Sequence, residues 1–378
     1  MDNKQHNTSM ISLLQYLFSI LVILVHSGRL FSQDVIHFTF KSFLGRMAVP
    51  YFLICTAFFL RGRIQQGLCN HSYFRKLINR MAVPYFLICT AFFLRGRIQQ
   101  GLCNHSYFRK LIKKYSMWTI IYLPYGYFFF ESLNIAKIYL LPGFIVAFLY
   151  LGMSHTLWYI PAVILGWFII QGLLKYVGTR GTFITVVVLY CIGAVETYSV
   201  FVQSTKFYPL MSTYMSIFQT TRNGLFYTPV YLLAGYLLYD YFNTDLFTKS
   251  RGLKYILFLL LLALENVLIY FNQGLDKNFF LLAPLCAVFL FNWSIRTSLF
   301  KGYRLSPLKQ LSVYYFFLHP LFVGIVSYCL KSTSLVAHHQ GKVIFVVTLA
   351  LTHACALLII KVVNKIPYQK IIPLSLSK

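Results

Sequence analysis

The sequence predicts an all-α fold, a polytopic transmembrane helix bundle of about ten spans that forms one domain over residues 1–378. Hydrophobic residues make up 58% of the chain and charged residues only 11%, and the mean hydropathy is +0.66. A soluble domain carries roughly 25% charged residues, so a soluble enzyme is excluded. Apolar runs of about 20 residues, the length of a membrane-crossing helix, also recur along the whole chain.

Ten apolar runs have the length and composition expected of spans. They cover residues 10–27, 47–60, 115–131, 156–174, 183–203, 224–243, 253–271, 278–294, 312–330 and 343–363. The stretch 135–151 is also apolar, but Pro142 and Gly143 interrupt it. We expect an interfacial or re-entrant piece there. No basic leader or small-residue cleavage site precedes the first run, so we expect this run to be retained as a span.

The formal charge of +26 is explained by membrane topology. Basic residues fall between the apolar runs and not in a patch with stacking aromatics, so we expect no nucleic-acid partner. With the N-terminus inside, 25 of the 34 basic residues lie on the cytoplasmic side and nine on the other. Cytoplasmic loops carry such an excess of Lys and Arg. The predicted location is the cell membrane, with several passes and both termini in the cytoplasm.

A tandem repeat interrupts this regular pattern. Residues 46–78 recur without a change at residues 80–112. Complete identity, loop positions included, indicates a recent duplication or an assembly artefact. The basic loops that follow the two copies both favour the cytoplasm, and a span between them would force one loop outside. The second apolar segment, 81–94, contains Pro84 and would give a helix of about 21 Å. We therefore expect 47–60 to span and 81–94 to lie in the interface or fold back.

Gln15 and His26 are the polar residues of the first run that draw attention. They are eleven residues apart, which places them on one helix face but about 16 Å apart along the axis, too far for direct contact. A histidine that ends an apolar helix is either an interfacial residue or a functional one, and composition leaves both interpretations open.

Several short motifs, weak when taken singly, occur in one order along the chain. They are His26 at the end of the first run, Arg46-Met-Ala-Val-Pro50, Tyr107-Phe-Arg-Lys-Leu-Ile-Lys-Lys114, His155-Thr-Leu-Trp158-Tyr-Ile-Pro161, Arg222-Asn-Gly-Leu-Phe-Tyr-Thr-Pro229 with Gly235, and Leu311-Ser-Val-Tyr-Tyr-Phe-Phe-Leu-His319-Pro320. Their order and spacing resemble the membrane acyltransferase-3 family, whose members O-acylate cell-surface glycans and related acceptors. The resemblance covers nearly the whole chain apart from the duplicated unit.

The resemblance implies that His26 is the catalytic residue. A neutral imidazole can accept the proton of an acceptor hydroxyl as that hydroxyl attacks a thioester carbonyl, and its ordinary pKa near 6.5 suits this role. The family usually has Arg eleven residues before this histidine, where this chain has Gln15. We expect Gln15 to contribute to binding of the acyl donor. The lost cation implies altered donor binding, a different acyl group or a member without activity.

The implied donor is acyl-CoA, with acetyl-CoA expected, and its phosphates require cations. Lys110, Lys113 and Lys114 match the family's basic motif before the third span. The same lysines are equally well explained by the cytoplasmic charge bias. The first copy of the repeat offers similar cations, so the sequence leaves open which set faces a donor.

On the acceptor side, the resemblance points to four residues. They are Arg222, Asn223, Trp158 and His319. Interfacial anchoring is the competing explanation for Arg222 and for Trp158. Three other polar residues occur within predicted spans, where buried ionisable groups are often functional. For these residues, Glu196, Glu265 and His353, we favour hydrogen bonds between helices.

The resulting hypothesis is an integral membrane O-acyltransferase that transfers an acyl group from acyl-CoA to a hydroxyl of an envelope glycan or a similar acceptor. No metal is expected, because HExxH and other ligand spacings are absent from the sequence. The first alternative is a transporter-like module, because a domain with this family's pattern also occurs attached to amino-acid racemases. The second is an inactive product of the duplication.

Overall fold

The computed structural model describes residues 6–66, 112, 115–132, 137–152 and 157–365. The described part contains fifteen α-helices and no strand, which confirms the all-α class. The chain divides into two compact units. Unit 1 comprises Met1–Ala48 and Ile295–Lys378, and unit 2 comprises Val49–Ser294. The second repeat copy and the predicted segment 81–94 lie outside the described residues.

Unit 1 holds four α-helices and the start of a fifth. Their bounds are α1 Thr8–His26, α2 Asp34–Thr39, α17 Ser306–Leu330 and α18 Ala337–Lys365, with α3, Ala48–Gln65, beginning at the border with unit 2. A π-helical turn, Phe40–Leu44, and a 3-10 turn, Gly45–Met47, join α2 to α3. The helical path is therefore continuous from Asp34 to Gln65, a length of 32 residues.

Unit 2 holds the remaining helices. Their bounds are α7 Leu123–Ser132, α8 Leu140–Val146, α9 Tyr159–Tyr176, α10 Gly178–Ala194, α11 Ser199–Val202, α12 Tyr208–Phe218, α13 Thr228–Asp240, α14 Asp245–Thr248, α15 Arg251–Phe271 and α16 Ala283–Arg296, whose last two residues fall in unit 1. Residues 115–121 are helical too and precede α7. A π-helical turn, Ala147–Leu151, follows α8 within the predicted interfacial stretch.

Six described helical segments are long and apolar enough to cross a membrane, against the ten spans predicted. They are Thr8–His26, Asp34–Gln65, Tyr159–Tyr176, Arg251–Phe271, Ser306–Leu330 and Ala337–Val362. The other four predicted spans coincide with α7, α10, α13 and α16, which have 10, 17, 13 and 14 residues. At a rise of about 1.5 Å per residue, these helices are shorter than the roughly 30 Å apolar layer of a bilayer.

The structure differs from the predicted helices at one boundary and by one additional helix. The predicted span 183–203 ends at Ala194, because the chain turns there and begins the short α11 at Ser199. Glu196 therefore lies in a turn and not in mid-helix. The sequence analysis also did not anticipate α12, Tyr208–Phe218, in the predicted loop between two spans.

Helix α15 is polar toward the protein and apolar toward the outside, as in proteins that sit in lipid. On α15, Leu260, Leu264 and Phe271 are 59%, 67% and 76% exposed, whereas Glu265 and Asn266 are 7% and 3% exposed. In water this arrangement would leave a wide apolar face uncovered. The long apolar helices and their outward apolar faces indicate a multi-pass membrane protein.

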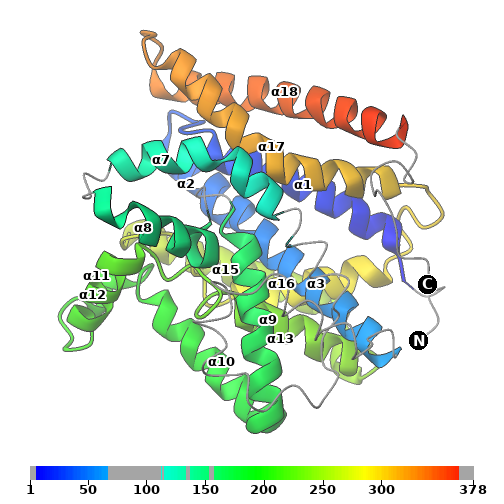
Figure 1. Ribbon diagram of the computed structural model, residues 1–378. Coiled ribbons are helices and arrows are strands. Elements are labelled where there is room, and N and C mark those ends of the chain that lie inside the picture. The colour runs from blue at the N-terminus through cyan, green and yellow to red at the C-terminus, as the bar shows by residue number, and fades with distance from the viewer. Residues whose placement is uncertain (1–5, 67–111, 113–114, 133–136, 153–156, 366–378) are drawn as a thin grey trace, which may run out of the picture. The chain divides into compact units, whose positions relative to one another are not determined.

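In unit 1, α17 packs against both α1 and α18, as Figure 1 shows. Asn7 caps α1 by accepting a hydrogen bond from the Met10 amide, and its amide nitrogen donates to the carbonyl oxygens of Thr297 and Leu299 at 2.7 Å. Farther along, Ser312 Oγ donates to the carbonyl oxygen of Gln15. The helices α1 and α17 therefore run in the same direction.

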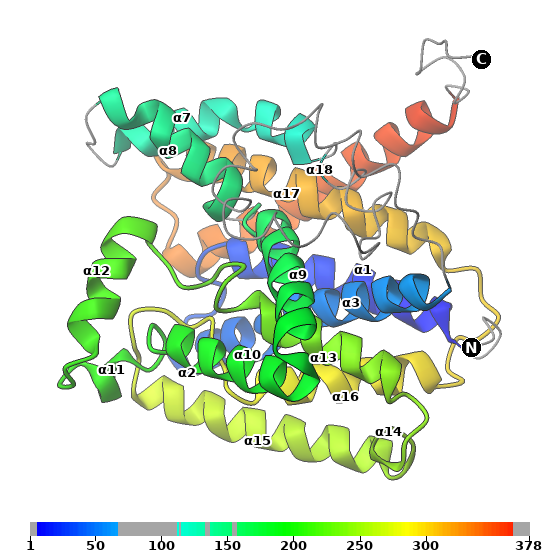
Figure 2. The ribbon, with the colours of Figure 1, turned by 60° about the horizontal axis from the view of Figure 1, so that its bottom comes forward.

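In unit 2, α9, α10 and α13 pack pairwise, and Figure 2 shows them together. Gly235 on α13 permits a close helix contact, because a Cβ atom there would lie 2.4 Å from the carbonyl oxygen of Ile54 on α3. Small residues allow such approaches between membrane helices. At one end of this unit, Arg61 donates two hydrogen bonds to Asp240, at 2.7 and 3.0 Å.

Candidate functional site

His26 and His319 meet in unit 1. Their ring centroids lie 5.5 Å apart, with His26 at the last turn of α1 and His319 in the middle of α17. His319 is completely buried, and its Nδ1 donates to the carbonyl oxygen of Tyr315 at 2.8 Å. The neutral ring then carries its lone pair on Nε2. That atom has no hydrogen-bond partner among the described residues.

A chain of polar side chains continues from His319 along the same helices. The Tyr315 hydroxyl lies 2.7 Å from Nδ1 of His353 and 3.3 Å from the Tyr16 hydroxyl. These contacts join α1, α17 and α18 at one level of unit 1. The contact between Tyr315 and His353 agrees with our expectation that His353 forms a hydrogen bond between helices. Gln15, the neighbour of Tyr16, contacts α17 through its own carbonyl oxygen.

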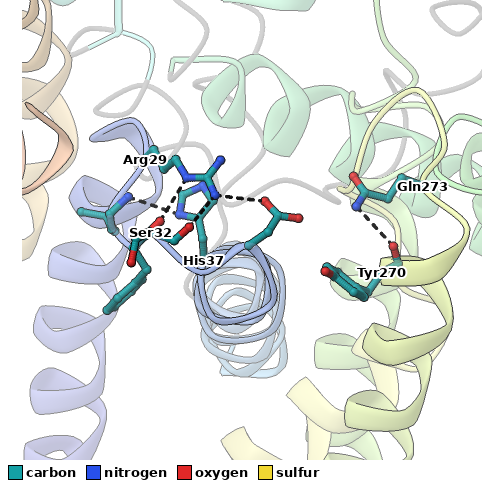
Figure 3. A network of polar contacts seen from close by, with 8 residues as sticks. Arg29, Ser32, His37, Tyr270 and Gln273 are labelled. Atoms are coloured by element: carbon teal, nitrogen blue, oxygen red, sulfur yellow. Dashed lines mark hydrogen bonds and ion pairs between the residues drawn. The ribbon is translucent and has the colours of Figure 1, made fainter. Parts of the chain in front are cut away.

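The loop after His26 is held by its own hydrogen bonds, which Figure 3 displays. Arg29 donates to the carbonyl oxygens of Phe31 and Ser32, and the Leu30 amide donates to Nδ1 of His37. On α18, Gly341 packs directly on this loop, since a Cβ atom there would lie 1.7 Å from the Arg29 carbonyl oxygen. The end of α1 that carries His26 is thereby fixed against α18.

A second cluster lies in unit 2, around the start of α13. The Arg222 guanidinium lies over the Trp158 ring, 4.8 Å from its centroid, and its Nη1 donates to Oδ1 of Asn278 at 3.0 Å. Asn223 is completely buried, and its Oδ1 accepts hydrogen bonds from the amides of Leu225 and Phe226. Asn223 thus fixes the backbone at this turn, while Arg222 presents its charge beside an aromatic ring.

Glu196 joins this cluster from the end of α10. Its Oε2 accepts hydrogen bonds from Thr220 Oγ1 at 3.0 Å and from the amide and the hydroxyl of Thr221 at 2.7 and 2.6 Å. Burial and the neighbouring Asp276 carboxylate raise the pKa of Glu196, against the effect of these hydrogen bonds. Glu196 lies in a turn outside the candidate spans.

Asp276 and Asn278 connect the two charged residues of this cluster. Asp276 accepts hydrogen bonds from Thr197 Oγ1 at 2.8 Å and from the side chain of Asn278, which in turn accepts from Arg222. Sequence reasoning missed Asp276 and Asn278. The sequence feature that could have revealed them is a short polar run, Asp276-Lys277-Asn278, between two apolar segments.

Glu265 has a structural role. Its carboxylate accepts hydrogen bonds from the amides of Leu281 and Leu282, just before α16, and from the Tyr198 hydroxyl. A carboxylate at the start of a helix satisfies amides that have no partner within the helix. The favoured interpretation of Glu265 as a hydrogen-bonding residue agrees with these contacts.

The predicted site residues thus fall into separate groups. His26, Gln15 and His319 lie in unit 1, where His26 meets His319. Trp158, Arg222 and Asn223 lie together in unit 2. The predicted donor residues Lys110, Lys113 and Lys114 lie outside the described residues.

Comparison with known proteins identifies distant relatives. An amino-acid racemase of Enterococcus faecalis is 27% identical over 321 residues, which cover 82% of this chain and 38% of that protein. Another amino-acid racemase of the same organism is 27% identical over 231 residues, covering 59% of this chain and 32% of the relative. A serine/alanine racemase of Enterococcus gallinarum is 25% identical over 209 residues, covering 55% and 30%. No family model and no solved structure matches the chain.

The chain is thus a helical membrane protein with distant homology to one part of amino-acid racemases. It spans between 30% and 38% of the length of these curated relatives. The described part of this chain contains six helices that are long and apolar enough to cross a membrane. None of these relatives carries the name of an acyltransferase, so the family resemblance of the motifs stays a hypothesis.

Proposed function

We propose that the chain is a transport module for a small amino acid, related to the membrane part of amino-acid racemases. The observation that carries the proposal is the alignment, which covers 82% of this chain but only 38% of an amino-acid racemase. Racemases act on amino acids, which are zwitterions at neutral pH. A zwitterion cannot cross the apolar layer of a bilayer unaided, because both of its charges would lose their hydration. A helical membrane module beside a racemase most simply supplies it with substrate.

The name of one relative, serine/alanine racemase, suggests the solutes to test first. Purified full-length chain reconstituted in liposomes should take up labelled L-serine or L-alanine faster than empty liposomes. Unlabelled L-serine in excess should compete with this uptake, whereas a sugar should not. Uptake equal to that of empty liposomes, with both amino acids, would overturn the proposal.

A second function, O-acyl transfer, is favoured by one specific contact. His26, the predicted base, lies beside the buried His319. In this proposal His26 accepts the proton of an acceptor hydroxyl as it attacks the thioester carbonyl of acyl-CoA, and the thiolate of CoA leaves. Lys110, Lys113 and Lys114 would bind the CoA phosphates, and the acceptor would be an envelope glycan. His319 would act as a positioning residue for His26.

An assay with labelled acetyl-CoA and envelope polysaccharide separates the two functions. General-base catalysis contributes about 10²- to 10⁴-fold in rate, so His26→Ala should reduce transfer by that amount. His339→Ala is a matched control, because His339 is an exposed histidine of the same unit. Transfer that survives His26→Ala would remove His26 from the mechanism, and absence of transfer in the wild type would leave only transport.

Both functions assume a multi-pass protein of the cell membrane with cytoplasmic termini. The contacts within each unit are consistent with that topology. In unit 1, Asn7 contacts the segment 295–303, and both are expected on the cytoplasmic side. Arg29 and Gly341 also meet, and both are expected on the outer side. A reporter fused after residue 30 should therefore report an external location, and one fused after residue 301 an internal location.

A further inference from the structure

Two oppositely charged residues of unit 2, Glu196 and Arg222, are both connected to the segment 220–222. Glu196 accepts hydrogen bonds from Thr220 and Thr221, and Arg222 follows directly in the chain. The described residues contain three ion pairs, Arg29–Asp34, Arg61–Asp240 and Lys249–Asp245. Arg222 and Glu196 take part in none of them. Adjoining residues therefore hold these two charged side chains, but the two side chains form no ion pair with each other.

Arg222 retains capacity to bind an anion. Its described contacts are the Trp158 ring and, through Nη1, the Asn278 oxygen. Its Nε lies out of contact with solvent and has no hydrogen-bond partner among the described residues. A buried donor without an acceptor is costly. Guanidinium groups bind carboxylates through two parallel hydrogen bonds, so a ligand carboxylate is the natural partner for this side chain.

Glu196 retains capacity to bind a cation. The side chain is 5% exposed, and its protein hydrogen bonds all go to Oε2. Oε1 has no partner among the described residues. The Asp276 carboxylate lies close enough to raise the pKa of Glu196 through its charge. Two neighbouring carboxylates, of which Glu196 is buried and Asp276 is partly exposed, favour a bound ammonium group, which reduces their mutual repulsion.

We propose that Arg222 and Glu196 form a binding site for a zwitterionic α-amino acid, whose carboxylate binds Arg222 and whose ammonium group binds Glu196 beside Asp276. The inference rests on the proposed function and names its recognition site. An α-amino acid carries its two charged groups on one carbon atom, so it can bridge an arginine and a glutamate that form no ion pair with each other. By the predicted topology, Trp158, Glu196, Arg222 and Asp276 all belong to the outer ends of their segments, where a solute from outside would enter.

The test measures binding of labelled L-serine to the full-length chain in detergent, with competition by unlabelled analogues. Serinamide keeps the ammonium group without a carboxylate, and N-acetylserine keeps the carboxylate without an ammonium group. Each analogue loses one charge-assisted pairing, so each should compete about ten- to a hundredfold less well than L-serine. These analogues test the site without altering the fold.

The matched variants are Arg222→Gln and Glu196→Gln, with the exposed residues Arg304→Gln and Glu131→Gln as controls. Each site variant should weaken L-serine binding about ten- to a hundredfold, while the controls bind as the wild type does. In addition, Arg222→Gln should abolish the preference for L-serine over serinamide. Glu196→Gln should abolish the preference for L-serine over N-acetylserine.

The outcomes separate the site from the transport function. Uptake of L-serine that Arg222→Gln and Glu196→Gln leave unchanged would overturn the site and support transport. Binding that requires both charges, in a protein that shows no uptake, would support the site and overturn transport. Equal competition by serinamide, N-acetylserine and L-serine would overturn the site, and so would a wild type that binds no amino acid.

Discussion

The imidazole of His26 meets the imidazole of His319 at a centroid distance of 5.5 Å, although the two residues are almost 300 positions apart. The contact places the end of α1 against the middle of α17. His319 is buried and presents a lone pair on Nε2 that no described residue satisfies. An unsatisfied polar atom in a buried position reduces stability. Its presence here is therefore explained better by function than by packing.

His319→Leu should separate function from stability. Leucine has a similar size, and it removes a buried nitrogen that has no partner, so the free energy of unfolding in detergent should stay equal or rise by up to about 1 kcal/mol. Acyl transfer or amino-acid uptake, whichever the wild type performs, should fall. A large loss of stability with unchanged activity would assign His319 a purely structural role.

The pH dependence of L-serine binding should reveal Glu196. Burial and Asp276 raise the pKa of Glu196 above its ordinary value, so this group takes up a proton at a higher pH than an exposed glutamate does. Binding of an ammonium group requires the ionised carboxylate. The dissociation constant for L-serine should therefore begin to rise, as the pH falls, at a higher pH than the protonation of an ordinary exposed glutamate would require.

The titratable groups that interact with Glu196 are the carboxylate of Asp276 and the neutral hydroxyl of Tyr214. Glu196→Gln should give weaker binding that changes little as the pH falls, measured by equilibrium dialysis. A variant that keeps the full pH dependence of the wild type would assign it to another group.

Gly341→Ala should destabilise unit 1. The added Cβ atom would lie 1.7 Å from the Arg29 carbonyl oxygen, so the start of α18 would have to move from the loop after α1. Overpacking of this kind costs about 1–3 kcal/mol. The measurement is the unfolding midpoint of the purified protein in detergent.

Gly324→Ala on α17 is the control for Gly341→Ala. No atom lies within 4 Å of a Cβ placed at Gly324, and alanine favours helix over glycine. This variant should therefore be as stable as the wild type or slightly more stable. If Gly341→Ala were equally harmless, the close approach between α18 and the Arg29 loop would be wrong.

Asp240→Asn should lower the stability of unit 2. In the predicted topology, Asp240 lies at the opposite end of this unit from Arg222. Asp240 accepts two hydrogen bonds from Arg61 and one from Gln65, and the side chains of the ion pair are only 20% and 22% exposed. Loss of the charged acceptor should reduce the free energy of unfolding by about 1–2 kcal/mol.

The exposed pair Lys249–Asp245 provides the comparison for Asp240. Its side chains are 74% and 76% exposed, so Asp245→Asn should cost about 0.5 kcal/mol or less. Denaturation of both variants under identical conditions measures the difference. Equal losses would mean that burial does not strengthen the Arg61–Asp240 pair.

Composition and hydropathy predicted the class of protein, because both are sums over local stretches of the chain and do not depend on which residues pack together. The predicted spans 10–27, 253–271 and 312–330 coincide with long apolar helices for this reason. Helix length was harder to predict, since a run such as 183–203 stays apolar where the chain already turns at Ala194. A hydropathy window cannot distinguish an apolar helix from an apolar turn.

The contacts between polar residues, by contrast, could be found only in the folded chain. His26 contacts His319, and Glu196 accepts a hydrogen bond from Thr221, the residue before Arg222. Both contacts depend on how each helix is rotated and on which neighbour it packs against. These contacts join residues far apart in the chain. Their energy depends on three-dimensional geometry, which composition and hydropathy do not describe. The same holds for Asn278, whose role appears only once Arg222 lies beside it.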